Sequence, residues 1–376
     1  MNLTFTEEQE ILRKFAKDFM TEKLPKKVLK ELEPSAEGYS KEMWKEMADL
    51  GWMGLPFPEK YGGSDMTFLD LAVLLEEMGK AAMPGPYLPT VILGGMTIFK
   101  YGSEEQKQEY LPKISSGQTI ITMAIDEPDK SITTPPDAVK ATKDGDSWVI
   151  EGAKMFVPYA DAADYILCVA RTDGKAGSED GITVFIVDAK DPGVTCNKLE
   201  TLVDKHSEVI FNKVKVPANN VIGEAGKAWK NVLEIIKIAD VAKCCEMAGM
   251  AQQVLDMTVD YAKERKQFGK PIGTFQILQH YCADLFINVE GIKMSAYQAA
   301  WKLSEGLDFE DEAAWAKTFA IPAADQIMAL SHQVHGAIGV TMEYDLHYYT
   351  RRLKSGELNF GDREYYTELI SSSLGI

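Results

Sequence analysis

The sequence predicts a multi-domain α+β protein, because three zones of the chain differ in the spacing of their apolar residues. Residues 1–118 and 226–376 carry apolar side chains at helical spacing, whereas 119–225 consist of short β-branched and aromatic runs divided by turns. We therefore expect an N-terminal helical domain over 1–118 and a central β domain of barrel or sandwich form over 119–225. A C-terminal four-helix-bundle domain is expected over 226–376.

The N-terminal zone opens with a helix-start signal. Thr6 and Gln9 form a capping-box pattern ahead of apolar residues at helical spacing. Further helices are predicted near 41–50, 68–80 and 104–113. Two Gly/Pro-rich stretches, "GLPFPEKYGGSD" (54–65) and "AAMPGPYLPT" (81–90), are predicted to be connecting loops of the kind that often line a pocket.

The central zone contains four clear strand signals. Each is a short run of β-branched or aromatic residues with Gly, Asp, Asn or Pro at its boundaries. The runs are "DGDSWVIEG", "DYILCVART", "GITVFIVDAK" and "EVIFNKVKVP".

The C-terminal zone reads as long helices with one interruption. Methionines and other apolar residues form a stripe before it, which is typical of a buried face. The interruption is "ERKQFGKPIGTFQ" (264–276), where Gly269, Pro271 and Gly273 lie within five positions and force a turn. By itself this stretch is equally compatible with a helix–helix connection and with a ligand site.

Charge and composition exclude several classes of function. The net charge of −17 argues against nucleic acid and against an anionic membrane surface as partners. No apolar run approaches the roughly 18 residues that a membrane span needs. The first residues lack a basic segment followed by an apolar core, so we predict a cytoplasmic protein.

Cysteine and histidine spacing does not favour a metal site. The five cysteines include no CxxC pair, and His332 and His335 lack further ligands nearby. The adjacent Cys244 and Cys245 could be redox-active, but we expect them to be small buried core residues.

Two ordered motifs resemble those of the acyl-CoA dehydrogenase family. "ERKQFGKPIGTFQ" is similar to that family's signature, and "QVHGAIGVTMEYDLHYYTRR" (333–352) to its glutamine, glycine-rich turn and Glu-Tyr segment. "GWMGLPFPEKYGGSD" (51–65) resembles the family's N-terminal loop, and the central strands also match. The likeness extends over the whole chain.

The resemblance implies an FAD cofactor that lies across a subunit interface. Arg265 would approach the pyrophosphate of a neighbouring subunit's flavin, with Phe268 and Gln276 flanking the nucleotide. Gln333 and Gly336 would form the other side of the cradle. A homotetramer, or a heteromer with a related subunit, is the assembly that follows.

In the β domain, the segment "MAIDEPDKSITTPPD" (123–137) stands where the family grips flavin. The resemblance therefore implies flavin contacts from Met123, Ile125 and Asp126, with Asp126 in place of a threonine. Phe156 replaces a tryptophan over the flavin and can still stack on it.

The family's reaction removes a proton from Cα of an acyl-CoA and passes hydride from Cβ to FAD, with an electron-transfer flavoprotein as the next acceptor. Its base is usually a glutamate before a glycine, and here Phe360 precedes Gly361. Some members carry the base on the helix ahead of the signature. In this chain Ala239 has that place, and Asp240 replaces the following arginine.

Three interpretations follow. The base has moved to Asp240, the better candidate, or to Glu357, although each could also be a solvated surface carboxylate. Alternatively the substrate is an alicyclic or activated acyl-CoA whose labile proton lies away from Cα. In the third interpretation, the chain is a catalytically silent subunit of a heteromeric dehydrogenase.

Overall fold

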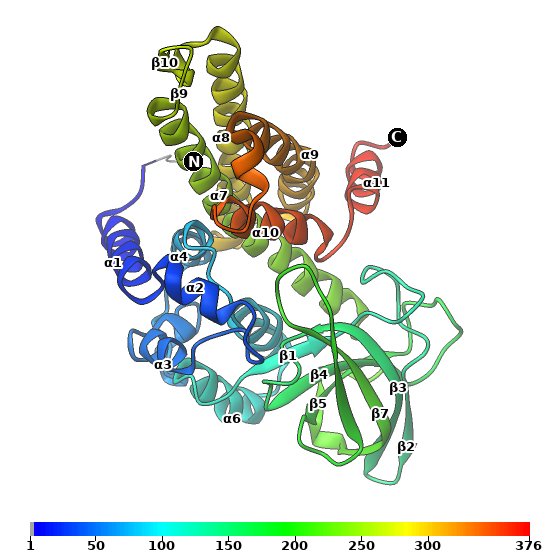
Figure 1. The fold of residues 1–376 in the computed structure, drawn as a ribbon. Coiled ribbons are helices and arrows are strands. Elements are labelled where there is room, and N and C mark those ends of the chain that lie inside the picture. Colours follow the sequence, from blue (N-terminus) through cyan, green and yellow to red (C-terminus); the bar gives the residue numbers. More distant parts are fainter. Residues whose placement is uncertain (1–3) are drawn as a thin grey trace. The chain divides into compact units, whose positions relative to one another are not determined.

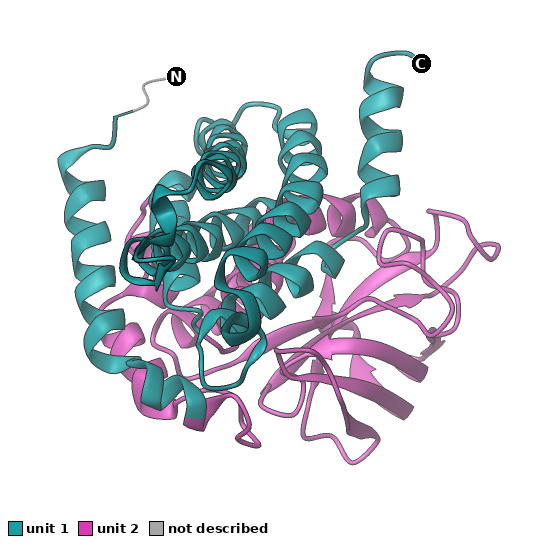
Figure 2. Cartoon of the chain, turned by 45° about the horizontal axis from the view of Figure 1, so that its top comes forward, with its two compact units in different colours: residues 1–30, 67–83, 240–376 teal, residues 31–66, 84–239 magenta. Residues whose placement is uncertain are grey.

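The computed structural model describes residues 4–376, and its elements are labelled in Figure 1. The chain divides into two compact units, coloured in Figure 2. Unit 1 comprises residues 1–30, 67–83 and 240–376, and unit 2 comprises 31–66 and 84–239. Neither unit is a continuous segment, so the predicted boundaries at 118 and 225 stay predictions.

Unit 2 contains short helices and the only large sheet of the described residues. Its helices are α3 (Lys41–Asp49), a π-helical segment (Leu88–Met96), α5 (Thr97–Tyr101) and α6 (Glu104–Ser115). Single 3-10 turns lie at Trp52–Gly54, Glu59–Tyr61 and Ala218–Asn220. The predicted loop 81–90 is wrong in its last residues, because the π-helical segment begins there despite Pro89 at its N-terminus, a position that tolerates proline.

The sheet has eight strands in the order β6-β7-β3-β2-β4-β5-β8, with β1 paired in parallel to β4. The strands are β1 (Ile121–Ala124), β2 (Lys140–Asp144), β3 (Ser147–Pro158), β4 (Tyr165–Arg171), β5 (Ile182–Asp188), β6 (Val194–Leu199), β7 (His206–Pro217) and β8 (Val221–Ile222). Most residues of β4 and β5 are buried, which accounts for their nearly continuous apolar sequence.

The central β domain is thus confirmed, and of the two forms expected for it, barrel and sandwich, the barrel is wrong. Within residues 4–376 the strand order ends at β6 on one side and β8 on the other, so the sheet does not close. Alternating apolar strands carry the same signal in open and closed sheets, because the pattern reports burial rather than closure.

Unit 1 is helical. It contains α1 (Glu7–Lys23), most of α2 (Lys26–Leu32), α4 (Phe68–Lys80), α8 (Gln276–Ser304), α9 (Glu310–His335), α10 (Leu346–Leu358) and α11 (Arg363–Ser373). The long helix α7 (Trp229–Glu264) begins in unit 2 and continues into unit 1. The Thr6 capping box and the helical C-terminal zone are confirmed.

Two glycines bring α4 and α7 into close contact within unit 1. A Cβ on Gly249 would lie 1.9 Å from the carbonyl oxygen of Glu76, and one on Gly79 would lie 2.1 Å from that of Glu246. Neither position has room for a side chain. Cys244 and Cys245 are buried on the same helix, so the core interpretation of this pair is supported.

The helix interruption contains a two-residue hairpin that the sequence analysis did not anticipate. β9 (Lys266–Gln267) pairs with β10 (Lys270–Pro271) across Phe268 and Gly269, both with positive φ. Such a turn matches the twist of a hairpin.

Within residues 4–376, none of the helices combines the length and apolar character of a membrane span.

Candidate functional site

The hairpin exposes the residues expected to meet a nucleotide. Phe268 is 91% exposed, and Arg265 and Gln276 are also exposed. Within residues 4–376 no carboxylate pairs with the Arg265 guanidinium, although the chain is strongly acidic. An exposed, unpaired guanidinium is suited to a phosphate or pyrophosphate group.

Apolar packing joins this hairpin to the C-terminal end of α9. Ala262 and Ile272 form a small buried cluster with Val334, and Phe275 packs against it. The Tyr261 ring also stacks on His335, with centroids 4.6 Å apart. The structure therefore brings together the two motifs, which lie far apart in the sequence.

Gln333 and Gly336 lie at this end of α9 and are exposed. Gly336 has φ +64°, and nothing lies within 4 Å of a Cβ built on it. The open space leaves room for a ligand to approach the backbone there. Its neighbour His335 is buried, and its ring nitrogens lie 2.7 Å from the Ser331 carbonyl oxygen and 3.0 Å from the Tyr344 hydroxyl.

In unit 2, the three residues of the segment 123–137 that are expected to contact flavin differ in their exposure. The Met123 and Ile125 side chains are buried in the core, so they are not exposed to a ligand. Asp126 is partly buried, and burial raises the pKa of its carboxyl to about 6, although Lys154 opposes this shift. With this pKa the carboxyl is mostly ionised at pH 7 and takes up a proton below about pH 6.

Phe156 is the exposed aromatic residue of this part of the sheet. It is 56% exposed and has φ +51°, at an irregularity in the pairing of β3 with β7 between Lys154 and Val157. A phenylalanine at positive φ is strained, and such strain is found frequently at functional sites. The Met155 amide donates to the Asp126 carbonyl oxygen at 2.9 Å, which holds the two segments together.

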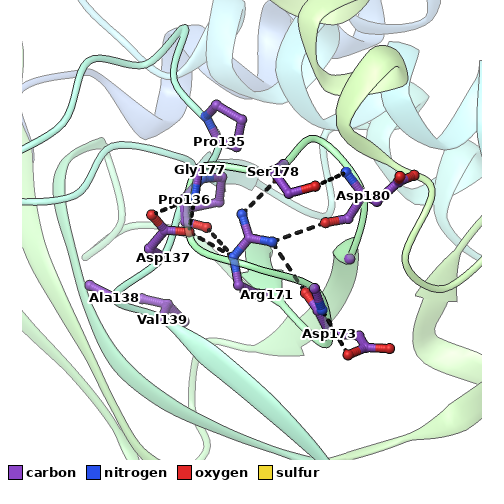
Figure 3. A network of polar contacts seen from close by, with 12 residues as sticks. Pro135, Pro136, Asp137, Ala138, Val139, Arg171, Asp173, Gly177, Ser178 and Asp180 are labelled. Atoms are coloured by element: carbon purple, nitrogen blue, oxygen red, sulfur yellow. Dashed lines mark hydrogen bonds and ion pairs between the residues drawn. The ribbon is translucent and has the colours of Figure 1, made fainter.

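Two buried polar networks fix the loop that follows Asp126. Glu127 accepts the amides of Asp137, Ala138 and Val139 at 2.7–2.9 Å and pairs with the buried Lys154 at 3.1 Å. In Figure 3 the Arg171 guanidinium binds Asp137 Oδ1 at 2.7 Å and four carbonyl oxygens, those of Pro136, Asp173, Ser178 and Asp180. The loop is therefore held at both ends.

The two candidate bases lie in ion pairs in unit 1. Asp240 is fully buried and pairs with Lys317, also fully buried, at 2.8 Å. Burial raises the pKa of Asp240 to about 7, while Lys317 lowers it. The interpretation of Asp240 as a solvated surface carboxylate is therefore wrong. Glu357 is 16% exposed in its side chain and pairs with Lys354 at 2.7 Å.

Phe360 lies in the loop between α10 and α11 with φ +62°, directly before Gly361 with φ +121°. The Tyr366 hydroxyl donates to the Phe360 carbonyl oxygen at 3.1 Å. Sequence analysis missed Lys317 and Tyr366, because a lysine and a tyrosine within helices carry no local signal of burial. Among residues 4–376 no group of three potential metal ligands is found.

Three models of acyl-CoA dehydrogenase domains match the chain: the N-terminal domain over 6–118, the middle domain over 122–214 and the C-terminal domain over 226–375. A caffeyl-CoA reductase–Etf complex subunit, CarC, of Acetobacterium woodii is 32% identical over 347 residues, which cover 90% of this chain and 91% of that protein.

Solved structures agree with these matches. The butyryl-CoA dehydrogenase of Megasphaera elsdenii superimposes with a TM-score of 0.93 at 30% identity, covering 100% of each chain. A chain of the ChsE4–ChsE5 complex of Mycobacterium tuberculosis superimposes with a TM-score of 0.90 at 27% identity, covering 100% of this chain and 99% of that one.

Proposed function

Because the chain belongs to the acyl-CoA dehydrogenase family, we propose that it dehydrogenates a non-standard acyl-CoA, such as an alicyclic or otherwise activated thioester. The family, its FAD cofactor and its oxidoreductase chemistry on CoA thioesters agree with the sequence-based expectation. The absence of the usual glutamate, and what replaces it, are part of the proposal.

The described residues fit an FAD cofactor. The exposed Arg265 is suited to a pyrophosphate, and Phe268 and Gln276 are exposed beside it. Gln333 and Gly336 border the same end of unit 1, and Phe156 offers an aromatic face in unit 2. FAD, when bound, supplies the acceptor for the substrate's hydride, whereas these residues bind and orient it.

The observation that carries the proposal is that both candidate proton acceptors, Asp240 and Glu357, lie in ion pairs. Phe360 cannot accept a proton, and Asp240 and Glu357 are each neutralised by a lysine. A substrate with a more acidic C–H bond makes a smaller demand on the base, and one whose labile proton lies away from Cα needs its base at another place in the site. Burial favours Glu357 over Asp240 as the group that could reach a substrate, which reverses the preference drawn from sequence.

We also propose a homotetramer, or a heteromer with a related subunit, and an electron-transfer flavoprotein as acceptor. Helices α8 and α9 expose large apolar side chains, which are Ile277, Phe286, Ile287, Met294, Trp315 and Phe319. Exposed apolar side chains in such number are typical of surfaces that a partner covers. The relative from A. woodii is named as a subunit of an Etf complex. We keep the cytoplasmic location and the four-helix bundle as predictions.

An anaerobic titration tests this function. The purified protein is titrated with linear and with alicyclic CoA thioesters while the visible flavin band is followed. We expect one class, the activated or alicyclic one, to bleach the band, and Glu357→Gln to slow the bleaching by about 10²-fold or more. Bleaching by linear saturated thioesters at the same rate would contradict the choice of substrate.

A second candidate is a catalytically silent subunit of a heteromeric dehydrogenase. The same ion-paired carboxylates favour it, since a subunit without chemistry needs no free base. A colourless protein, or a yellow one that no thioester bleaches until a related subunit is added, would support this function instead.

A further inference from the structure

Lys317 on α9 has three acceptors in a fully buried position. Its Nζ pairs with Asp240 Oδ1 at 2.8 Å and donates to the carbonyl oxygens of Gly356 at 3.0 Å and Asn359 at 2.5 Å. The ammonium group is thus completely engaged. Asp240 supplies the opposite charge that offsets the cost of burying this lysine. A buried cation without a counter-ion is strongly destabilising.

Two successive carbonyl groups of the loop are fixed by side chains from neighbouring helices. Lys317 holds the Asn359 carbonyl, and the Tyr366 hydroxyl, on α11, holds that of Phe360. All described peptide bonds are trans, so each N–H points away from the carbonyl of its own peptide unit. The Phe360 amide therefore points away from Lys317, and the Gly361 amide points away from Tyr366.

Neither amide has an acceptor in the described part of the chain, and Phe360 keeps a positive φ that costs about 1 kcal/mol or more for a residue with a side chain. Three side-chain contacts hold the loop against this strain. Lys317 binds the carbonyl oxygens of Gly356 and Asn359, and Tyr366 binds that of Phe360. Without them the loop would relax toward ordinary φ values, and the two peptide units would rotate.

We propose that Lys317, with Asp240 as its counter-ion, and Tyr366 are positioning residues that hold the loop 356–361 so that the Phe360 amide can bind the thioester carbonyl oxygen of the substrate. The inference rests on the proposed function. It gives Asp240 a role other than base. The chain thereby keeps stabilisation of the developing negative charge on that oxygen although the glutamate is absent.

Isotope-edited infrared spectroscopy tests the proposal. A 2-enoyl-CoA with ¹³C at its thioester carbonyl is bound to the purified protein, and the C=O stretching frequency is compared with that of the free thioester. In the wild-type chain we expect a lower frequency, because the carbonyl accepts a hydrogen bond. Lys317→Met should abolish most of the shift and lower kcat/KM by about 10²-fold, as for removal of one oxyanion donor.

The variants separate positioning from a general loss of structure. Tyr366→Phe removes one hydroxyl, so the fold should persist, and we expect it to lose part of the shift. Lys302→Met is the matched control, since Lys302 pairs with the buried Glu312 at 2.6 Å in the same unit but does not contact the loop. This control should keep the full shift.

Asp240→Asn distinguishes the two roles of Asp240. A positioning role predicts a smaller frequency shift, whereas a base would lower kcat and leave the frequency unchanged. A wild-type chain that binds the thioester without any shift, or a Lys317→Met variant that keeps it, would overturn the inference while leaving the proposed function intact. Failure of the thioester to bind at all would instead count against the proposed function.

Discussion

The backbone at Phe360 has a positive φ, which is unfavourable for every residue with a side chain. The strain of the loop therefore does not depend on which side chain stands at this position. Its φ of +62° is equally unfavourable for glutamate. Exchange of this one residue therefore changes the chemistry of the loop without changing its folding cost.

Phe360→Glu should create a base. We expect the variant to oxidise linear saturated acyl-CoA thioesters at least about 10²-fold faster than the wild-type chain, since a positioned base contributes 10²–10⁴-fold. The rate of anaerobic flavin bleaching measures this. Phe360→Gln is the control of equal size, and an equal gain in both variants would show that space rather than basicity is responsible.

Asp126 should make the free energy of unfolding decrease as the pH rises through the acidic range. Burial raises its pKa from 3.8 to about 6, so the folded state holds this proton more tightly than the unfolded state does. The folded state therefore loses stability as pH rises from about 4 to 6 and no further above that. Relative to Asp126→Asn, the free energy of unfolding of the wild-type chain should fall by roughly 1–3 kcal/mol across this window.

Urea unfolding at several pH values measures this difference. Asp146→Asn serves as the control, because Asp146 is an exposed aspartate of the same unit, in the turn between β2 and β3. A difference between the wild-type chain and Asp126→Asn that is constant from pH 4 to 6 would contradict the prediction.

At the scale of elements, a buried carboxylate joins three helices of unit 1. Glu76 on α4 accepts from the Tyr297 hydroxyl on α8 at 2.5 Å and pairs with Lys80 at 3.0 Å, Lys293 at 3.2 Å and Arg13 on α1 at 3.5 Å. Burial alone would raise the pKa of Glu76, but these partners outweigh it and lower the value to about 2.

Glu76→Gln should destabilise the fold by about 3–5 kcal/mol at pH 7, because three partly buried cations lose the buried carboxylate that they share. The depressed pKa means that this stabilisation is complete above pH 4.5 and is lost as pH falls toward 2. The gap between wild-type and variant in urea unfolding should therefore shrink in that range. Glu10→Gln, at an exposed pair with Arg13, should change stability little.

Elements were predictable where their signal is local. The helical period and the capping box identified most helices, and Gly269, Pro271 and Gly273 identified the interruption after α7. The hairpin within it and the π-helical segment Leu88–Met96 were missed. Both contain glycine and proline, which mark a loop in the sequence whether or not hydrogen bonds form there.

At the scale of the whole molecule, we expect cofactor retention to depend on Arg265, whose guanidinium pairs with no carboxylate within residues 4–376. Arg265→Met should weaken FAD binding by about tenfold or more, through loss of a charge-assisted contact to the pyrophosphate. The ratio of flavin absorbance to protein after gel filtration measures this. Lys263→Met, which removes a nearby exposed positive charge paired with Asp260, should retain FAD, and equal loss in both variants would indicate only a general charge effect.

The sequence by itself determined the family, the helical–β–helical order and the FAD chemistry, because ordered motifs and apolar periods are local properties. Only the tertiary structure decided the state of the candidate bases. Asp240 lies 77 residues from Lys317, and Lys317 lies a further 39 and 42 residues from the carbonyl groups that it binds. Burial and ion pairing between such distant residues arise only when the helices pack, and they set both the charge and the accessibility of a carboxylate.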